Sequence, residues 1–126
     1  MIGALTIASS VFASCPFDSR TDITGYWHGT NQSGSTIGNM SFHIEKVTNN
    51  NFSGYAFLTT SHCLSGECTL LADLLYKKLP FSGSCNAYMK LESVVFNNKQ
   101  ADWVSGHSFG SSLQEYGIDY TATMEF

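Results

Sequence analysis

The alternation of apolar and polar residues is clearest at the C-terminal end of the chain. Every second residue there is apolar or aromatic: Tyr116, Ile118, Tyr120, Ala122, Met124 and Phe126. The residues that alternate with them, at positions 117, 119, 121, 123 and 125, are glycine or polar, so the period of two is uninterrupted. This period predicts a β-strand with one buried and one solvent-exposed face, as in an antiparallel sheet that packs on a core.

Earlier segments show weaker forms of the same pattern. Met40, Phe42 and Ile44 alternate with polar residues, and a polar run at 48–51 predicts a turn before a second strand at 52–60. Short loops of this kind join neighbouring antiparallel strands. The sequence therefore predicts a β-hairpin here.

A second hairpin is expected nearer the C-terminus. It consists of strands at 87–96 and 101–109 with a turn at 97–100, and a further turn at 110–112 leads into the last strand. Between the hairpins, the leucines within 69–79 fit helical spacing better than alternation, so this segment is either a short helix or a strand. We predict an all-β fold, an antiparallel up-and-down meander of seven or eight strands that closes into a small barrel or sandwich.

The N-terminal 13 residues predict a signal peptide. They carry no charged side chain and end in Val11, Phe12 and Ala13, with small residues at the positions that signal peptidase reads. We therefore assign 1–13 to a signal and 14–126 to a single all-β domain that is secreted or periplasmic. Two alternatives remain open: a buried first element of the fold, or a lipobox that ends in Cys15, in which case lipidation would anchor the protein to a membrane.

Four cysteines follow the signal, namely Cys15, Cys63, Cys68 and Cys85. An even number in an exported protein indicates two disulfides. We favour Cys63 with Cys68 and Cys15 with Cys85 among the three connectivities that four cysteines allow.

The composition and charge of the chain limit the classes of molecule that it is expected to bind. The chain has 126 residues, of which 43% are hydrophobic and 13% charged, as expected for one packed domain. Its net charge of −4 and its scattered cations provide no basic surface. We therefore expect no binding to nucleic acid.

No motif predicts an enzyme. Residues 106–110 match the G-x-S-x-G pattern of α/β-hydrolases, but no histidine follows His107, and that fold places its catalytic histidine after the serine. A zinc site from His62, Cys63, Cys68 and Cys85 is an alternative to disulfides, and an oxidising compartment favours the disulfides. We expect no catalytic residue, metal or cofactor.

A family resemblance begins at Gly25 and Trp27, because Gly-x-Trp in the first strand resembles the start of lipocalins and avidins. Asn31, Gly34 and Ser35 are similar to the avidin run that follows this tryptophan, and 52–55 resembles the next hairpin. The resemblance covers about 23–56. It implies an up-and-down barrel that holds a small ligand in its mouth.

The predicted ligand site lies on the inward face of the last two strands. It combines aromatic walls with polar groups: Trp103, Ser105, His107, Tyr116 and Tyr120. The alternative that remains open for these residues is a filled core, in which the tyrosine hydroxyls and His107 hydrogen-bond one another. We therefore expect a small exported binding protein for a small apolar or amphipathic ligand. The alternative is a disulfide-stabilised protein-binding module, such as an inhibitor of a secreted or periplasmic enzyme, with the loop between Cys63 and Cys68 as its tip.

Overall fold

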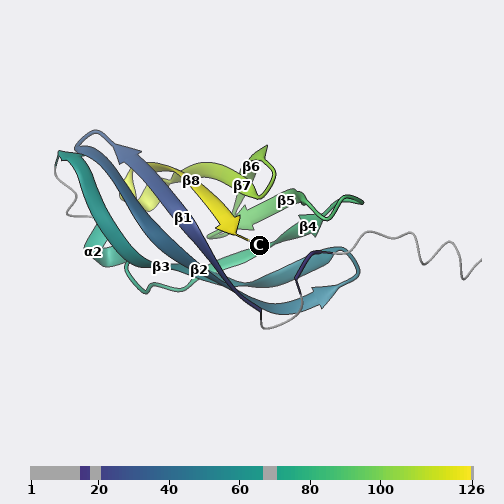
Figure 1. The fold of residues 1–126 in the computed structure, drawn as a ribbon. Helices are drawn as coiled ribbons and strands as arrows, with labels where there is room; N and C mark the ends of the chain where they lie inside the picture. The colour runs from purple at the N-terminus through teal and green to yellow at the C-terminus, as the bar shows by residue number, and fades with distance from the viewer. Residues whose placement is uncertain (1–14, 18–20, 67–70, 126) are drawn as a thin grey trace, which may run out of the picture.

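The computed structural model describes residues 15–17, 21–66 and 71–125, and the predicted signal peptide lies outside them. Within these residues, eight antiparallel strands follow one another around a closed barrel, and the last strand pairs with the first (Figure 1). The strands are β1 (Thr21–Asn31), β2 (Gly34–Thr48), β3 (Asn51–Gly66), β4 (Leu79–Cys85), β5 (Leu91–Phe96), β6 (Lys99–Ser105), β7 (Ser108–Leu113) and β8 (Ile118–Glu125).

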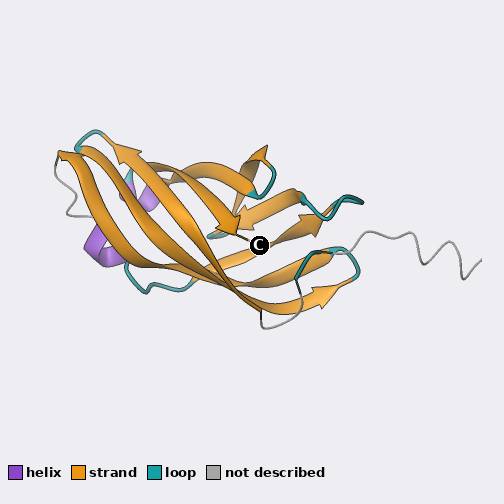
Figure 2. Cartoon of the chain, in the orientation of Figure 1, coloured by secondary structure: helices purple, strands orange, loops and turns teal. Residues whose placement is uncertain are grey.

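The predicted all-β meander is confirmed, and it closes as a barrel rather than a sandwich. Strands dominate the described chain, as Figure 2 shows. The segment predicted as helix or strand contributes one helical turn, α2 (Leu71–Leu74), and β4 begins soon after it. In β8, alternate residues from Ile118 to Met124 are buried, as the period of two predicts.

The predicted boundaries in the C-terminal half are partly wrong. Residues 110–112 lie inside β7 instead of forming a turn, and the chain reverses at Gly106 and His107. Gly106 has a left-handed φ of +51° and open space where a Cβ would stand, whereas a Cβ on Gly110 would lie 2.7 Å from the carbonyl oxygen of Tyr120. Gly106 therefore serves the turn, and Gly110 serves the close pairing of β7 with β8.

Two further segments differ from the predicted strands. Residues 86–90 form a loop before β5, although a strand was predicted from residue 87. Tyr116 belongs to a short 3₁₀ turn, η1 (Gln114–Tyr116), which connects β7 to β8. The apolar alternation of the sequence includes Tyr116, but β8 begins only at Ile118. The strand does not extend back to Tyr116 because Gly117, with φ +62°, interrupts the extended backbone.

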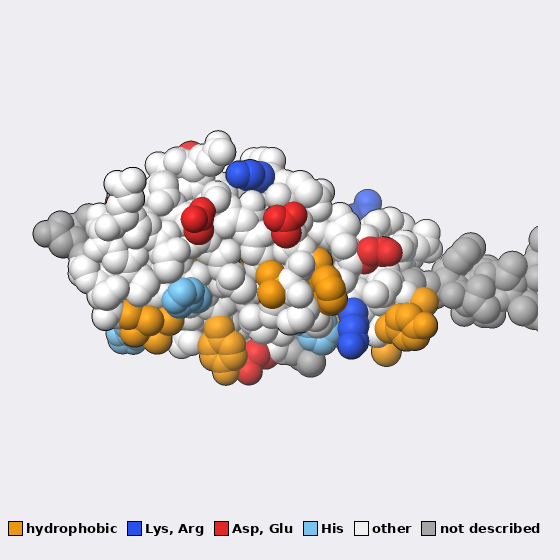
Figure 3. Space-filling model, turned by 90° about the horizontal axis from the view of Figure 1, so that it is seen from above, with side chains coloured by type: hydrophobic (Ala, Val, Ile, Leu, Met, Phe, Trp, Pro, Cys, Tyr) orange, Lys and Arg blue, Asp and Glu red, His pale blue; other side chains and the backbone are white. Residues whose placement is uncertain are grey.

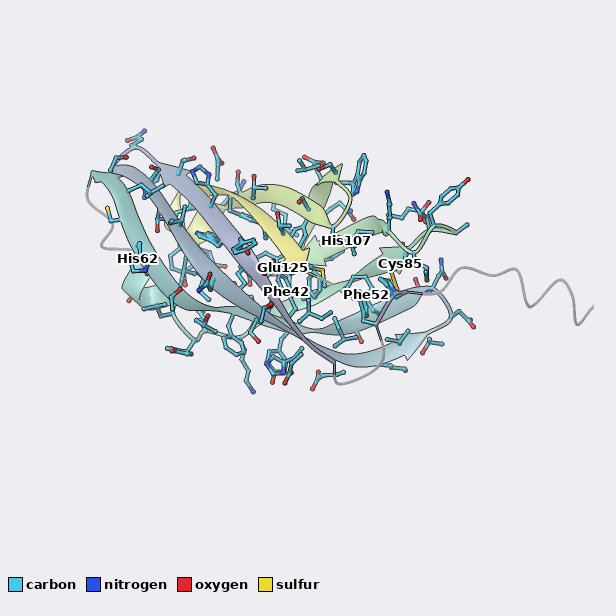
Figure 4. All side chains as sticks on the ribbon, in the orientation of Figure 1. Phe42, Phe52, His62, Cys85, His107 and Glu125 are labelled. Carbon is cyan, nitrogen blue, oxygen red and sulfur yellow. A yellow bond between two sulfur atoms is a disulfide. The ribbon has the colours of Figure 1, made fainter. Side chains whose placement is uncertain are left out.

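Aromatic rings fill the interior of the barrel. Phe42 from β2 lies 5.2 Å from Phe81 of β4 and 6.3 Å from Phe109 of β7, measured between ring centroids. All three side chains are at most 1% exposed, and Phe42 lies inside the barrel in Figure 4. Because rings from different sides of the wall meet in the centre, the side chains themselves occupy the axis.

Three connections meet at one end of the barrel, which we call the disulfide end: the β2–β3 turn, the β4–β5 loop and the β6–β7 turn. The predicted disulfide between Cys15 and Cys85 forms here, with an S–S distance of 2.10 Å. The backbone N–H of Cys85 donates a hydrogen bond to the Asn50 carbonyl at 2.8 Å, which ties β4 to the β2–β3 turn. Phe17 packs edge-on against Phe52 at 5.2 Å, so the N-terminal segment is part of the core.

Candidate functional site

The structure does not gather the five side chains of the predicted ligand site. Tyr120 is buried at 5% exposure, whereas Trp103 is 53% exposed and Ser105 is also exposed. His107 lies in the β6–β7 turn, and Tyr116 lies in η1, beyond the other end of β7. The geometry that the period of two predicted for these residues is therefore wrong, because the strand divides at Gly106.

Tyr120 belongs to the filled core. Its ring stacks in parallel on Trp27, with centroids 4.9 Å apart and planes 5° from parallel. Burial raises the pKa of its hydroxyl far above the usual range, and the charge of Asp102 acts in the same direction. Among the described residues, neither the Tyr120 hydroxyl nor the Trp27 Nε1 has a hydrogen-bond partner.

The disulfide end carries a different constellation, on the β4–β5 loop and at the end of β6, beside the β6–β7 turn. Four large apolar side chains are exposed there: Tyr88 at 81%, Trp103 at 53%, Val104 at 52% and Met89 at 51%. We call these four residues the tip patch. In Figure 3, hydrophobic side chains lie exposed at the right-hand end of the face, where β4 and β5 meet in Figure 1.

The β4–β5 loop is held in one conformation by its own hydrogen bonds. The Asn86 side-chain oxygen accepts from the backbone N–H of Tyr88 at 2.8 Å and of Lys90 at 3.2 Å. The Met89 N–H donates to the Asn86 carbonyl at 2.9 Å. The buried disulfide of Cys85 immediately precedes this loop, so its base is covalently fixed.

Met89 adopts a left-handed backbone with φ +59°. A residue other than glycine, asparagine or aspartate is uncommon in this region, and the conformation costs about 1 to 3 kcal/mol. The hydrogen bonds of the loop hold Met89 in place against that cost. Strain of this kind is concentrated at functional sites, which supports the loop as part of a binding surface.

His107 connects the two parts of the tip patch. Partial burial lowers the pKa of its imidazole, and the positive charge of Lys90 lowers it further, while a hydrogen bond with the Met89 backbone acts in the opposite direction. These interactions place the β6–β7 turn beside the β4–β5 loop. At the end of β6, the Trp103 Nε1 donates to the carbonyl of Gly106 in the turn at 3.2 Å, which restrains the exposed indole.

Sequence reasoning identified Trp103 and His107 but missed Tyr88, Met89 and Val104. A signal was present in two pairs of adjacent large apolar residues, 88–89 and 103–104, each separated by one residue from an Asn or Gly, Asn86 and Gly106. Adjacent residues of a strand point to opposite faces, so both members of such a pair cannot enter the core. The pairs therefore indicate exposed apolar surface.

The remaining sequence motifs have other roles. Ser108, the central serine of the G-x-S-x-G match, begins β7, and its Oγ lies 2.7 Å from the Thr123 Oγ1. The alternative zinc set does not form, since Cys85 is in the disulfide and His62 lies at the opposite end of the barrel (Figure 4). Among the described residues, no three metal-ligating side chains come together. Cys63 is also disulfide-bonded, and its predicted partner Cys68 lies outside the described residues.

The chain matches no protein-family model, and comparison with curated proteins and with solved structures finds no match either. The architecture, an eight-stranded antiparallel closed barrel, is compatible with the lipocalin and avidin resemblance. The described residues contain no helix of the length and apolarity needed to cross a bilayer. The disulfide is typical of proteins that fold in an oxidising compartment outside the cytosol.

Proposed function

We propose that this protein is an exported protein-binding module that inserts the tip patch into an apolar cleft of a partner protein, as an inhibitor of an exported enzyme would. The observation that carries the proposal is the exposure of four large apolar side chains on the restrained β4–β5 loop and the end of β6. Monomeric proteins rarely leave such groups together in solvent, and protein interfaces are enriched in Trp, Tyr and Met.

The filled barrel supports this choice over the small-ligand function that the family resemblance implies. Phe42, Phe81 and Phe109 occupy the space along the axis that a ligand would enter. A rigid core also benefits a protein-binding tip, because loops fixed before binding lose little conformational entropy on association. The Cys15–Cys85 disulfide provides this fixation where the sequence had suggested the Cys63–Cys68 loop.

The test compares two variants at opposite ends of the barrel. The double variant Tyr88→Ala, Trp103→Ala removes the two aromatic rings of the tip patch, and Leu64→Ala removes a side chain of similar exposure, 55%, from β3 near the other end. Each is immobilised, and proteins retained from the extracellular or periplasmic fraction of the expressing organism are identified and titrated. We expect the tip variant to bind the partner of the wild-type protein at least about 30-fold more weakly. This factor corresponds to a loss of about 2 kcal/mol in binding free energy, which is typical of a hot spot.

Folding of the variants is measured alongside. Trp103 is half exposed, so its truncation should cost far less stability than the 3 to 5 kcal/mol lost when a buried aromatic residue is truncated. A protein retained equally by wild type and the tip variant would not use the tip patch. If all retained proteins behave in that way, the proposal is wrong.

A further inference from the structure

A serine, a histidine and an aspartate lie in close contact on the outer face of β1 and β2. The register pairs Asp22 directly with His43, and Ser41 lies two residues before His43 on the same face of β2. The His43 Nδ1 is 2.8 Å from the Asp22 Oδ1, and the His43 Nε2 is 3.4 Å from the Ser41 Oγ. The two ring nitrogens therefore face different partners.

This connectivity matches the roles in a serine hydrolase. In such an enzyme the aspartate accepts from the Nδ1–H of the histidine, and the histidine Nε2 accepts the hydroxyl proton of the serine. The same roles would fall to Asp22, His43 and Ser41 with His43 in the Nδ1–H tautomer. A nucleophile and base in a ligand-free site are commonly farther apart than 3.2 Å and approach each other when substrate binds. Triads of this kind recur on unrelated folds and in different chain orders, so they are recognised by geometry rather than by position.

Aromatic packing fixes the orientation of the imidazole. The His43 ring stacks against Tyr55 at 4.9 Å and 12°, and against Phe57 at 5.4 Å and 18°. Its side chain is only 29% exposed although it lies on the outer surface. The Lys78 ammonium covers the ring of Tyr55 at 4.5 Å. A histidine held in this way keeps its Nδ1 beside Asp22 and its Nε2 beside Ser41.

A groove of about 340 Å³ lies beside the serine. Its lining includes Ser41 itself together with Thr24, Asn39, Thr59 and Glu125. Thr24 is the cross-strand partner of Ser41, and Asn39 precedes it by two residues on the same face. Thr24 and Asn39 thus flank Ser41 in the groove, and their hydroxyl and amide groups are of the kind that can donate to a carbonyl oxygen as it becomes negatively charged.

We propose that Ser41 and His43, positioned by Asp22, hydrolyse small neutral carboxylic esters bound in this groove. The Ser41 Oγ forms a bond to the ester carbonyl carbon while its proton moves to the His43 Nε2. The bond from carbon to the alkoxy oxygen then breaks, and His43 gives its proton to the departing alcohol. Water then attacks the acyl-serine by the same steps, with His43 again taking and returning the proton, which releases the carboxylic acid and restores the Ser41 hydroxyl.

Charge and shape define the substrate class. Glu125 lines the groove, where its Oε2 accepts from the Tyr26 hydroxyl at 3.0 Å, and Asp22 adds a second carboxylate nearby. Two negative charges disfavour anionic esters. The groove lies on an open outer surface rather than in the filled barrel, so we expect short acyl groups to be accepted.

The inference is independent of the tip patch and has its own test. The intact protein is treated with a fluorophosphonate probe, the adduct is located by peptide mass spectrometry, and hydrolysis of p-nitrophenyl acetate is followed in parallel. We expect labelling at Ser41 and faster hydrolysis than in buffer. Ser41→Ala should abolish the labelling and reduce hydrolysis to the rate in buffer.

Two further variants separate catalysis from folding. Asp22→Asn changes a side chain that is 71% exposed, so the barrel should remain folded while hydrolysis falls at least 10-fold. Ser108→Ala is the matched control, because the Ser108 hydroxyl faces Thr123 instead of a histidine, and it should leave labelling and rate unchanged. Absence of labelling at Ser41, hydrolysis that persists in Ser41→Ala, or an unchanged rate in folded Asp22→Asn would each overturn the proposal.

Discussion

The buried pair Trp27 and Tyr120 shows the limits of residue-level prediction. The period of two correctly placed Tyr120 on the buried face of the last strand. The sequence could not show that its ring stacks on Trp27 from β1, because that contact depends on closure of the barrel. Nor could the sequence show that the Tyr120 hydroxyl and the Trp27 Nε1 have no hydrogen-bond partner among the described residues, since hydrogen bonding depends on the complete surroundings of each atom.

Replacing Tyr120 with phenylalanine should stabilise the protein. A buried hydroxyl without a hydrogen bond costs about 1 to 3 kcal/mol, and Tyr120→Phe removes that group while keeping the stacked ring. We expect the free energy of unfolding, measured by urea denaturation, to rise by about 1 kcal/mol. Tyr26→Phe is the control, since the exposed Tyr26 hydroxyl donates to Glu125. A loss of stability in Tyr120→Phe would show that its hydroxyl is satisfied in solution.

His107 should make the stability of the protein depend on pH. Burial and Lys90 lower the pKa of His107 in the folded state, so the unfolded chain, with a histidine pKa of about 6.5, takes up the proton first. The stability contribution is therefore fully present above about pH 6.5 and is lost as the pH falls through the folded-state pKa. His107→Gln should show a smaller decrease in melting temperature between pH 7.5 and pH 5. Parallel decreases in both proteins would contradict this assignment.

At the scale of elements, alternation predicted the strands better than their ends. The turn at Asn49 and Asn50 was correctly placed, because a polar asparagine run interrupts two alternating segments. The β6–β7 turn was misplaced, because the sequence alone does not distinguish a turn glycine at Gly106 from a strand glycine at Gly110. Only the paired strand β8 shows that Gly110 is required for close approach and Gly106 for a left-handed turn.

Substitution of these two glycines should therefore have unequal effects. In Gly110→Ala, the added Cβ would meet the Tyr120 carbonyl at 2.7 Å, and the pairing of β7 with β8 must shift, at a cost of about 1 to 3 kcal/mol. Gly106→Asn introduces a residue that tolerates φ +51° into open space, so we expect a change below about 1 kcal/mol. Thermal denaturation of both variants is the measurement. A larger loss for Gly106→Asn would contradict the assigned roles.

At the scale of the whole molecule, the sequence predicted an antiparallel meander that closes as a barrel or a sandwich, and it predicted one of the disulfides that fix the fold. The even cysteine count and the favoured Cys15–Cys85 pairing anticipated the disulfide. The tip patch was not anticipated as a unit, because its halves are separated along the chain and meet only at the disulfide end. The Asp22, Ser41 and His43 cluster was missed for the same reason, since strand register joins residues that no motif spacing connects.

Removing the Cys15–Cys85 disulfide should affect global stability and the tip patch separately. The two cysteines are 70 residues apart, and closing a loop of that length in the unfolded chain stabilises a protein by about 4 kcal/mol on the chain-entropy model. The double variant Cys15→Ser, Cys85→Ser avoids a free thiol and should lose about that amount in urea denaturation. Under conditions where it remains folded, limited proteolysis should cut 86–90 faster than in the wild type, because the base of the loop is no longer fixed. Cleavage near Leu64 should change little, since that residue lies toward the opposite end of β3. Equal acceleration at both places would mean that the disulfide stabilises the barrel as a whole and does not specifically order the tip patch.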